Sequence, residues 1–344
     1  MLNKIKCCLK KTILDCLSLL GILNYLHYKN RNKVTVLMLH GVMAQNESVK
    51  WTPLRQQLLP SELERVLVIL SKYYHFITIE QCVDLLDGRV APIDNALLIT
   101  FDDGYRNTLD YALPICERFN IKPMFFITTG HINSGLPFWF DRLDYALQQN
   151  MGEESIRFNY HGVQYVFDTS SRQALTDSYK KFRDQCKNTF NNDADLNQLF
   201  TALSEMLESR SGKALADICK EDDWSAIASW QEIDNAFKQK RIDIGSHTVN
   251  HWRIDSLSKN EILEQLVNSK KEIEANLSTK CHYFCYPHGD YNQLSIDLLK
   301  QTHYRAAFTT DLGLCKSKDE LMTLKRFNFP VNKTKSEILY LLNH

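Results

Sequence analysis

Residues 96–108 read ALLITFDDGYRNT, an apolar run that ends directly on two neighbouring carboxylates and a glycine. The six residues before Asp102 are aliphatic, aromatic or β-branched, which indicates a buried strand. Two carboxylates beside a core are costly unless a cation or another partner compensates them. The stretch therefore predicts a strand whose end holds a cation or an aspartate that caps the next helix. Gly104 permits the sharp turn that follows.

Short strands and helices alternate on both sides of this stretch. Strands are predicted at residues 34–39, 76–79, 96–101, 124–128, 242–244, 283–286 and 306–309. Helices are predicted at residues 60–74, 79–86, 107–119, 259–276 and 293–302. Such alternation indicates an α/β fold with a parallel sheet or barrel. Residues of about 140–237 break the rhythm with long polar helical patterns, so we expect a mostly helical insertion there.

Length and composition exclude several classes of protein. The 344 residues carry 41 Lys+Arg and 41 Asp+Glu, so the formal net charge is zero, and 44% of residues are apolar. This balance excludes a disordered chain, and it offers no basic excess for binding nucleic acid. The ten cysteines form no Cys-x-x-Cys pair, which favours a reducing compartment and hence the cytoplasm.

The first 33 residues form a basic amphipathic segment ahead of one domain at residues 34–344. They hold seven Lys and Arg residues against the single acid Asp15, and residues 13–26 have apolar side chains at helical spacing. That run is too short and too polar to span a bilayer, and no signal-peptide cleavage site follows it. Two interpretations stay open: a helix packed on the domain, or peripheral contact of residues 1–30 with the inner membrane face.

Two further clusters follow predicted strands. Residues 245–251 read GSHTVNH, in which His247 and His251 have the i, i+4 spacing that places metal ligands on one side of a helical turn. Residues 284–291 read FCYPHGDY, where proline and glycine fix a turn. Barrel folds place their active sites at the carboxyl ends of strands, so we expect all three clusters to meet.

These motifs, in this order, closely resemble the polysaccharide deacetylase family, the NodB-homology group of carbohydrate esterases (family 4). VLMLHGV at residues 36–42 and SWQEI at residues 229–233 fit the same family. The resemblance covers residues of about 34–140 and 228–330. It implies a distorted (β/α)7 barrel and a metal-dependent hydrolase that removes an N-acetyl group from an aminosugar of a polysaccharide or glycan precursor.

The resemblance also implies a role for each matching residue. Asp102 corresponds to the general base, and Asp103, His247 and His251 correspond to the ligands of a divalent metal. Zinc suits one carboxylate and two imidazoles that leave positions open for water and substrate. The backbone N–H of His288 corresponds to a donor for the oxyanion.

Two departures from the family pattern concern the catalytic groups. Cys285 stands where the family carries an arginine that orients the catalytic aspartate, so another cation is expected there, Arg326 first and Arg142 second. The late Leu-x-His element, whose histidine protonates the leaving amine, has no match. Three histidines remain candidates for the general acid: His288, His282 and His40.

Aromatic side chains near the motifs are candidates for binding the sugar, because aromatic faces stack on sugar rings. We expect Tyr105, Trp139 and Tyr291, with Pro287, to line the substrate groove.

Two alternatives to deacetylation follow from the same residues. The missing arginine and acid suggest a carbohydrate-binding protein that keeps the fold but lacks turnover. The presence of Asp102 argues against it, because binding alone needs no second carboxylate beside a metal ligand. Deformylation of a lipid-linked aminosugar would use the same site.

Overall fold

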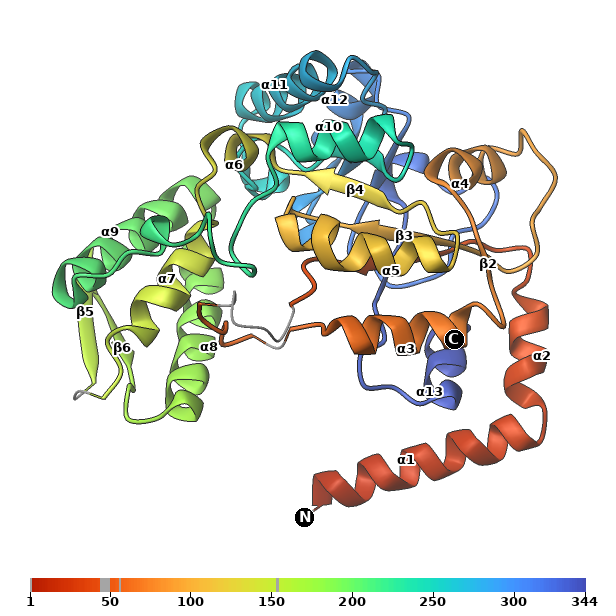
Figure 1. The fold of residues 1–344 in the computed structure, drawn as a ribbon, viewed down its shortest axis with the longest axis horizontal. Helices are drawn as coiled ribbons and strands as arrows, with labels where there is room; N and C mark the ends of the chain where they lie inside the picture. Colours follow the sequence, from red (N-terminus) through yellow and green to blue (C-terminus); the bar gives the residue numbers. More distant parts are fainter. Residues whose placement is uncertain (1, 44–49, 56, 153–154) are drawn as a thin grey trace.

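A curled parallel sheet organises the chain, and the structure, a computed structural model, describes residues 2–43, 50–55, 57–152 and 155–344 (Figure 1). Its strands are β1 (Thr35–Leu39), β2 (His75–Phe76), β3 (Ala96–Phe101), β4 (Met124–Ile127), β7 (Asp243–Ser246), β8 (Tyr283–Cys285), β9 (Ala306–Phe308) and β10 (Phe327–Asn328). Their order is β10-β1-β3-β4-β7-β8-β9, with β2 beside β3, and every pairing is parallel. The seven strands of this path form a curled sheet, and β2 pairs only with β3. This confirms the predicted α/β fold of the distorted (β/α)7 barrel type.

Helices cover the outer side of this sheet and bury a continuous apolar core against it. They are α3 (Pro60–Leu70), α4 (Ile79–Leu86), α5 (Leu113–Arg118), α6 (Thr129–Ser134), α10 (Trp230–Lys238), α11 (Lys259–Leu277), α12 (Gln293–Gln301) and α13 (Lys335–Leu341). Capping boxes begin α4, α10 and α11, because a Ser or Thr and the side chain three residues later satisfy the first free N–H groups. The helix predicted at residues 107–119 begins with a π-helical turn, Thr108–Ala112, ahead of α5.

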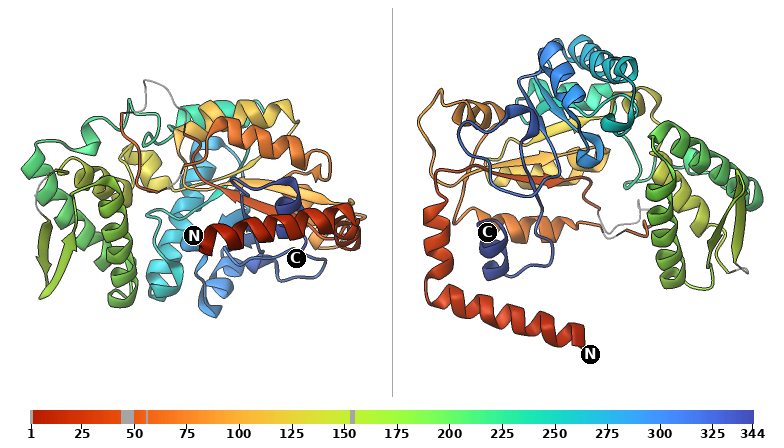
Figure 2. Two further views of the ribbon diagram at one scale, coloured as in Figure 1. Left: turned by 90° about the horizontal axis from the view of Figure 1, so that it is seen from below. Right: turned by 180° about the vertical axis from the view of Figure 1, so that it is seen from behind.

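The insertion packs around a hydrophobic core of its own beside the barrel (Figures 1 and 2). It contains α7 (Trp139–Gln148), the antiparallel hairpin β5 (Ile156–Tyr160) and β6 (Val163–Phe167), α8 (Arg172–Thr189) and α9 (Asp193–Ser211). The helical expectation overlooked the hairpin, whose two short strands flank a turn at residues 161–162. The expected end at residue 237 is also late, since α10 packs on α11 of the barrel.

Two helices precede the barrel. α1 (Leu2–Leu19) and α2 (Ile22–Lys29) are separated at Gly21, which has a left-handed φ of 75°. Leu14 and Leu23 are buried, and α1 runs along the edge of the molecule where it contacts α13 (Figure 2). Among the described residues, no helix is both long and apolar enough to span a bilayer. The side chains of residues 1–8 and 10, which hold several of the predicted basic groups, lie outside the described part.

Candidate functional site

The three motifs meet at the carboxyl end of the sheet. Asp102 and Asp103 directly follow β3, His247 directly follows β7, and Cys285 is the last residue of β8. Asp102, Asp103 and His247 border a cavity of about 560 Å³, which residues of α8 and α9 of the insertion also line. Cys285 lies behind this lining, against Asp102 and Arg326. The strand order makes this meeting possible, because only β4 separates β3 from β7.

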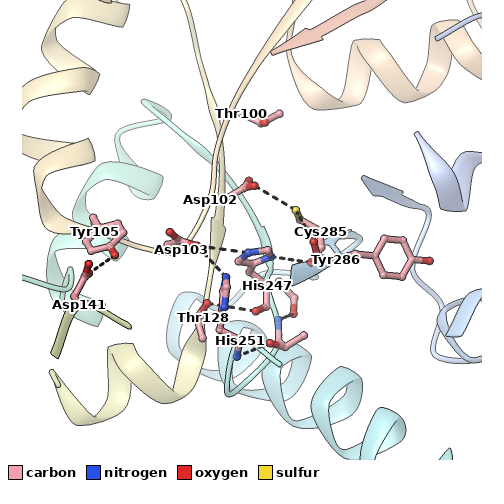
Figure 3. A network of polar contacts seen from close by, with 12 residues as sticks. Thr100, Asp102, Asp103, Tyr105, Thr128, Asp141, His247, His251, Cys285 and Tyr286 are labelled. Atoms are coloured by element: carbon pink, nitrogen blue, oxygen red, sulfur yellow. Dashed lines mark hydrogen bonds and ion pairs between the residues drawn. The ribbon is translucent and has the colours of Figure 1, made fainter. Parts of the chain in front are cut away.

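Asp103 faces both histidines of the second motif (Figure 3). Its Oδ1 lies 3.6 Å from Nε2 of His247 and 3.3 Å from Nε2 of His251, and all three side chains are buried. The histidines do not share a helical turn, which corrects the expectation from their spacing. They stand on a loop in which Thr248 and His251 have left-handed φ values of 68° and 60°. The loop is held against the start of α6 by backbone hydrogen bonds from Thr129 and Gly130.

This donor set suits a divalent metal. One carboxylate and two imidazoles offer ligand atoms within 4.8 Å of one another. Nδ1 of His247 bonds the carbonyl oxygen of Cys285 at 2.8 Å, which aims Nε2 at Asp103 as the second shell of a metal site requires. Within the described residues, the buried Oδ1 of Asp103 has no hydrogen-bond partner. A buried carboxylate oxygen without a hydrogen bond, between two imidazoles, fits the role of a ligand to a divalent cation.

Asp102 is paired with Arg326, which comes from the segment ahead of β10. The guanidinium donates to both carboxylate oxygens, at 2.9 Å and 2.8 Å, and both side chains are buried. It also donates to the Cys285 thiol at 3.0 Å, so it occupies the space beside the position where the family motif carries arginine. Arg142, the other cation considered, is instead paired with Glu208 of the insertion.

Arg326 determines the charge state of Asp102. Burial opposes ionisation of the carboxyl group, but the adjacent guanidinium and its hydrogen bonds outweigh that effect, and the pKa of Asp102 is lowered. Arg326 is itself fixed by bonds to the Thr100 hydroxyl and the Thr309 carbonyl oxygen. Asp102 is therefore held as an oriented carboxylate beside the candidate metal ligands.

The three candidate acids differ in position. His288 lines the cavity with its ring centroid 5.1 Å from that of His251, and His40 lines the cavity too. Desolvation and the neighbouring His251 and Arg253 lower the pKa of His288. His282 precedes β8 at the amino end of that strand, opposite the site, and this position excludes it as the acid.

The backbone of His288 is also unusual. It has a left-handed φ of 58°, and in the described part of the chain no hydrogen bond uses its N–H group. A free donor at the rim of the cavity is what an oxyanion needs.

The predicted sugar-binding side chains separate into two groups. Trp139 lines the cavity, as expected. Tyr105 has no exposed surface: its ring stacks on Trp224, and its hydroxyl donates to Asp141 at 2.5 Å (Figure 3). Pro287 is buried within the third motif. Tyr105 and Pro287 therefore offer no face to a sugar, which corrects the prediction for both. Tyr291 donates to Asp311 at 3.0 Å and is not among the residues that border the cavity, and its role in sugar binding stays a prediction.

Several cavity residues were missed by the sequence patterns. Arg55 donates to Asp141 at 3.0 Å and to the Tyr105 hydroxyl at 2.9 Å, and it lies in an irregular segment that carries no motif. Arg183 and Lys187 reach the cavity from α8 of the insertion, where the family motifs do not extend. An i, i+4 spacing is compatible with one shared helix face, but a sequence does not tell whether that face is turned towards the cavity or towards solvent.

Comparison with known proteins identifies relatives of the whole arrangement. Residues 89–198 and 189–307, together more than half of the chain, match the family model described as polysaccharide deacetylase. YxkH of Bacillus subtilis (strain 168), whose name places it among the polysaccharide deacetylases, is 26% identical over 88 residues. That segment is 26% of this chain and 32% of the relative, so the match spans about a third of the curated protein.

Solved structures share the fold at low identity. The Streptococcus pyogenes deacetylase PplD in complex with acetate aligns with a TM-score of 0.58 and 16% identity, covering 91% of this chain and 99% of that one. IcaB from Ammonifex degensii aligns with a TM-score of 0.56 and 15% identity, covering 91% and 98% of the two chains.

Proposed function

The chain belongs to the polysaccharide deacetylase family, as its motifs predicted, and from this membership we propose that it hydrolyses the N-acetyl group of an aminosugar in a polysaccharide or glycan precursor. The family is one of hydrolases that cleave amide bonds. The observation that carries the proposal is the ionised Asp102 held beside the Asp103, His247 and His251 cluster. Binding alone would need no such second carboxylate.

Asp103, His247 and His251 would hold a divalent ion, and we propose zinc. When bound, such an ion lowers the pKa of a water molecule from about 15.7 towards 7 and polarises the acetamide carbonyl. Asp102 takes the proton of the attacking water, since Arg326 keeps this carboxylate charged and oriented. The N–H of His288 donates to the oxygen on which negative charge develops. For the group that protonates the leaving amine we propose His288 or His40, both of which line the cavity.

Metal content and acetate release test this proposal together. We expect full-length protein to bind one divalent ion, and acetate release from N-acetylglucosamine oligosaccharides to disappear after chelation and return with zinc. His247→Ala and His251→Ala will each lower metal affinity strongly, because a two-ligand site holds the ion poorly. His161→Asn, at the exposed hairpin turn of the insertion, is the control and should keep both metal and activity. Stoichiometric metal in both alanine variants would refute the assigned ligands.

Two other functions use the same residues. The missing motif arginine and the missing general acid suggested a carbohydrate-binding protein without turnover. Arg326 supplies a guanidinium to Asp102, which removes the first of these two reasons. Saturable sugar binding without acetate release by metal-loaded protein would favour the binding protein. Release of formate but not acetate would favour the deformylase.

A further inference from the structure

The inner face of α8 gives the cavity a positively charged wall. Tyr179, Arg183 and Lys187 are spaced four residues apart on this helix, and all three line the cavity. α8 belongs to the insertion, so this wall faces the catalytic groups from outside the barrel. His288 and Asp290 of the third motif border the same cavity: the charge of Arg183 contributes to lowering the pKa of His288, and the charge of Lys187 favours the ionised form of Asp290.

The other guanidinium groups of the cavity are neutralised by carboxylates. Arg55 is paired with Asp141 at 3.0 Å, Arg253 with Asp193 at 2.7 Å, and Arg326 with Asp102 at 2.8 Å.

Arg183 and Lys187 have no such neutralisation. Within the described part of the chain, neither has a carboxylate within ion-pair distance, and both are exposed. Asp144 also borders the cavity, and burial raises the pKa of its carboxyl group to about 7, so this group is partly protonated at neutral pH. Like charges four residues apart on one helix repel each other, so an anion between the two side chains would stabilise this face.

We propose that Arg183 and Lys187 bind an oxyanion carried by the substrate, so that the enzyme selects an anionic aminosugar glycan. This rests on the proposed function and deepens it. A guanidinium matches the paired oxygens of a phosphate or a carboxylate, and an ammonium adds an adaptable charge. The acetamido group lies at the metal-binding cluster while the charged substituent lies against α8, and the insertion thereby determines which glycan is accepted.

Calorimetry on the full-length, metal-loaded protein tests this with three probes. They are an N-acetylglucosamine disaccharide, the same disaccharide with a phosphate at its reducing end, and one in which glucuronate replaces the reducing sugar. We expect at least one charged probe to bind ten-fold or more tightly than the neutral one, with the advantage falling as salt rises. The stronger of the two charged probes identifies phosphate or carboxylate as the anion.

The paired variant Arg183→Gln/Lys187→Gln should abolish this preference and leave neutral-probe affinity unchanged. Lys180→Gln/Lys181→Gln removes the same charge from the same helix outside the cavity and should change nothing. Equal affinity for all probes, or equal loss in both paired variants, would overturn the anion site. Preserved preference without acetate release from any probe would instead leave the anion site standing and remove the proposed hydrolysis.

A second, independent observation concerns α1. Leu9, Ile13 and Cys16 of α1, together with Leu20 in the turn directly after it, follow one another at i, i+4, i+7 and i+11. All four are exposed, and the exposed fractions of Leu9, Ile13 and Leu20 are 60%, 51% and 74%. The buried Leu14 lies on another side of the helix. An apolar stripe turned away from the protein, in a segment with seven basic residues and one acid among its first 33, is complementary to an anionic bilayer surface.

We infer that α1 lies on an anionic membrane face and brings the enzyme to its substrate there. Full-length protein should sediment with phosphatidylglycerol-containing vesicles and bind phosphatidylcholine vesicles at least ten-fold more weakly. Ile13→Asn/Leu20→Asn should release it, whereas Val68→Asn/Val90→Asn, which removes two exposed apolar side chains elsewhere, should not. Unchanged vesicle binding in the α1 variant would refute the inference. If the parent protein does not bind vesicles but is a dimer, and the α1 variant is a monomer, the inference is also refuted. The apolar stripe is then an interface with a second copy of the chain.

Discussion

Asp102→Asn lowers the rate constant for acetate release by about 10²–10⁴-fold, the contribution typical of a positioned general base. Asparagine keeps the shape of the side chain and one oxygen for Arg326, but it cannot accept the proton of the attacking water. The metal-binding cluster is formed by other side chains, so metal content should stay at the parent level. The measurement is kcat and KM for a neutral N-acetylglucosamine oligosaccharide, alongside metal analysis of the same preparation.

The loss should fall on kcat while KM changes little, because Asp102 acts in the transition state rather than in binding. Asp168→Asn, at an exposed position of the insertion, is the matched control and should retain parental rates. Parental kcat in a metal-loaded Asp102→Asn preparation would exclude this residue as the base. It would then leave His40 or His288 for that role.

Arg326→Met destabilises the folded chain by about 3–5 kcal/mol, because it leaves the Asp102 carboxylate buried without its cation. The free energy of unfolding is measured by denaturant titration. Arg142→Met serves as the control: its partner Glu208 lies closer to solvent, and loss of such a pair changes stability by about 1 kcal/mol or less.

A double-mutant cycle separates charge from packing. Asp102→Asn/Arg326→Met should be markedly less destabilised than the sum of the single variants, since it removes both charges together. Additive losses would show that Arg326 stabilises the fold through its apolar contacts and its bonds to Thr100 and Thr309 instead.

The sequence predicted the helices and strands accurately where the local patterns were strong. The run before Asp102 predicted β3 to the residue, and the pattern at residues 79–86 did the same for α4. The two-residue strand β10 left no periodicity to detect, yet its flank delivers Arg326. Arg326 could be predicted only because Cys285 stands where the family carries an arginine, so that another cation was expected near Asp102. The structure shows the Arg326 guanidinium bonded to Asp102.

Residues whose role depends on tertiary contacts were harder to place. Tyr105 adjoins the first motif, but the turn at Gly104 directs its ring inward onto Trp224, and sequence proximity says nothing about that direction. The spacing of His247 and His251 predicted that the two side chains lie together, but it predicted a helical turn where the structure has a loop. A helix and a loop with left-handed residues can both bring such a pair together.

The route by which Arg326 reaches Asp102 has a consequence for biosynthesis. An arginine at the position of Cys285 would supply the counter-charge together with β8. Here a nascent polypeptide can already have β3, β7 and β8 outside the ribosome while the buried carboxylate still lacks its guanidinium. Chains that end before Arg326 keep a buried carboxylate without its cation, so we expect them to unfold more readily than the whole chain and to be removed by proteolysis.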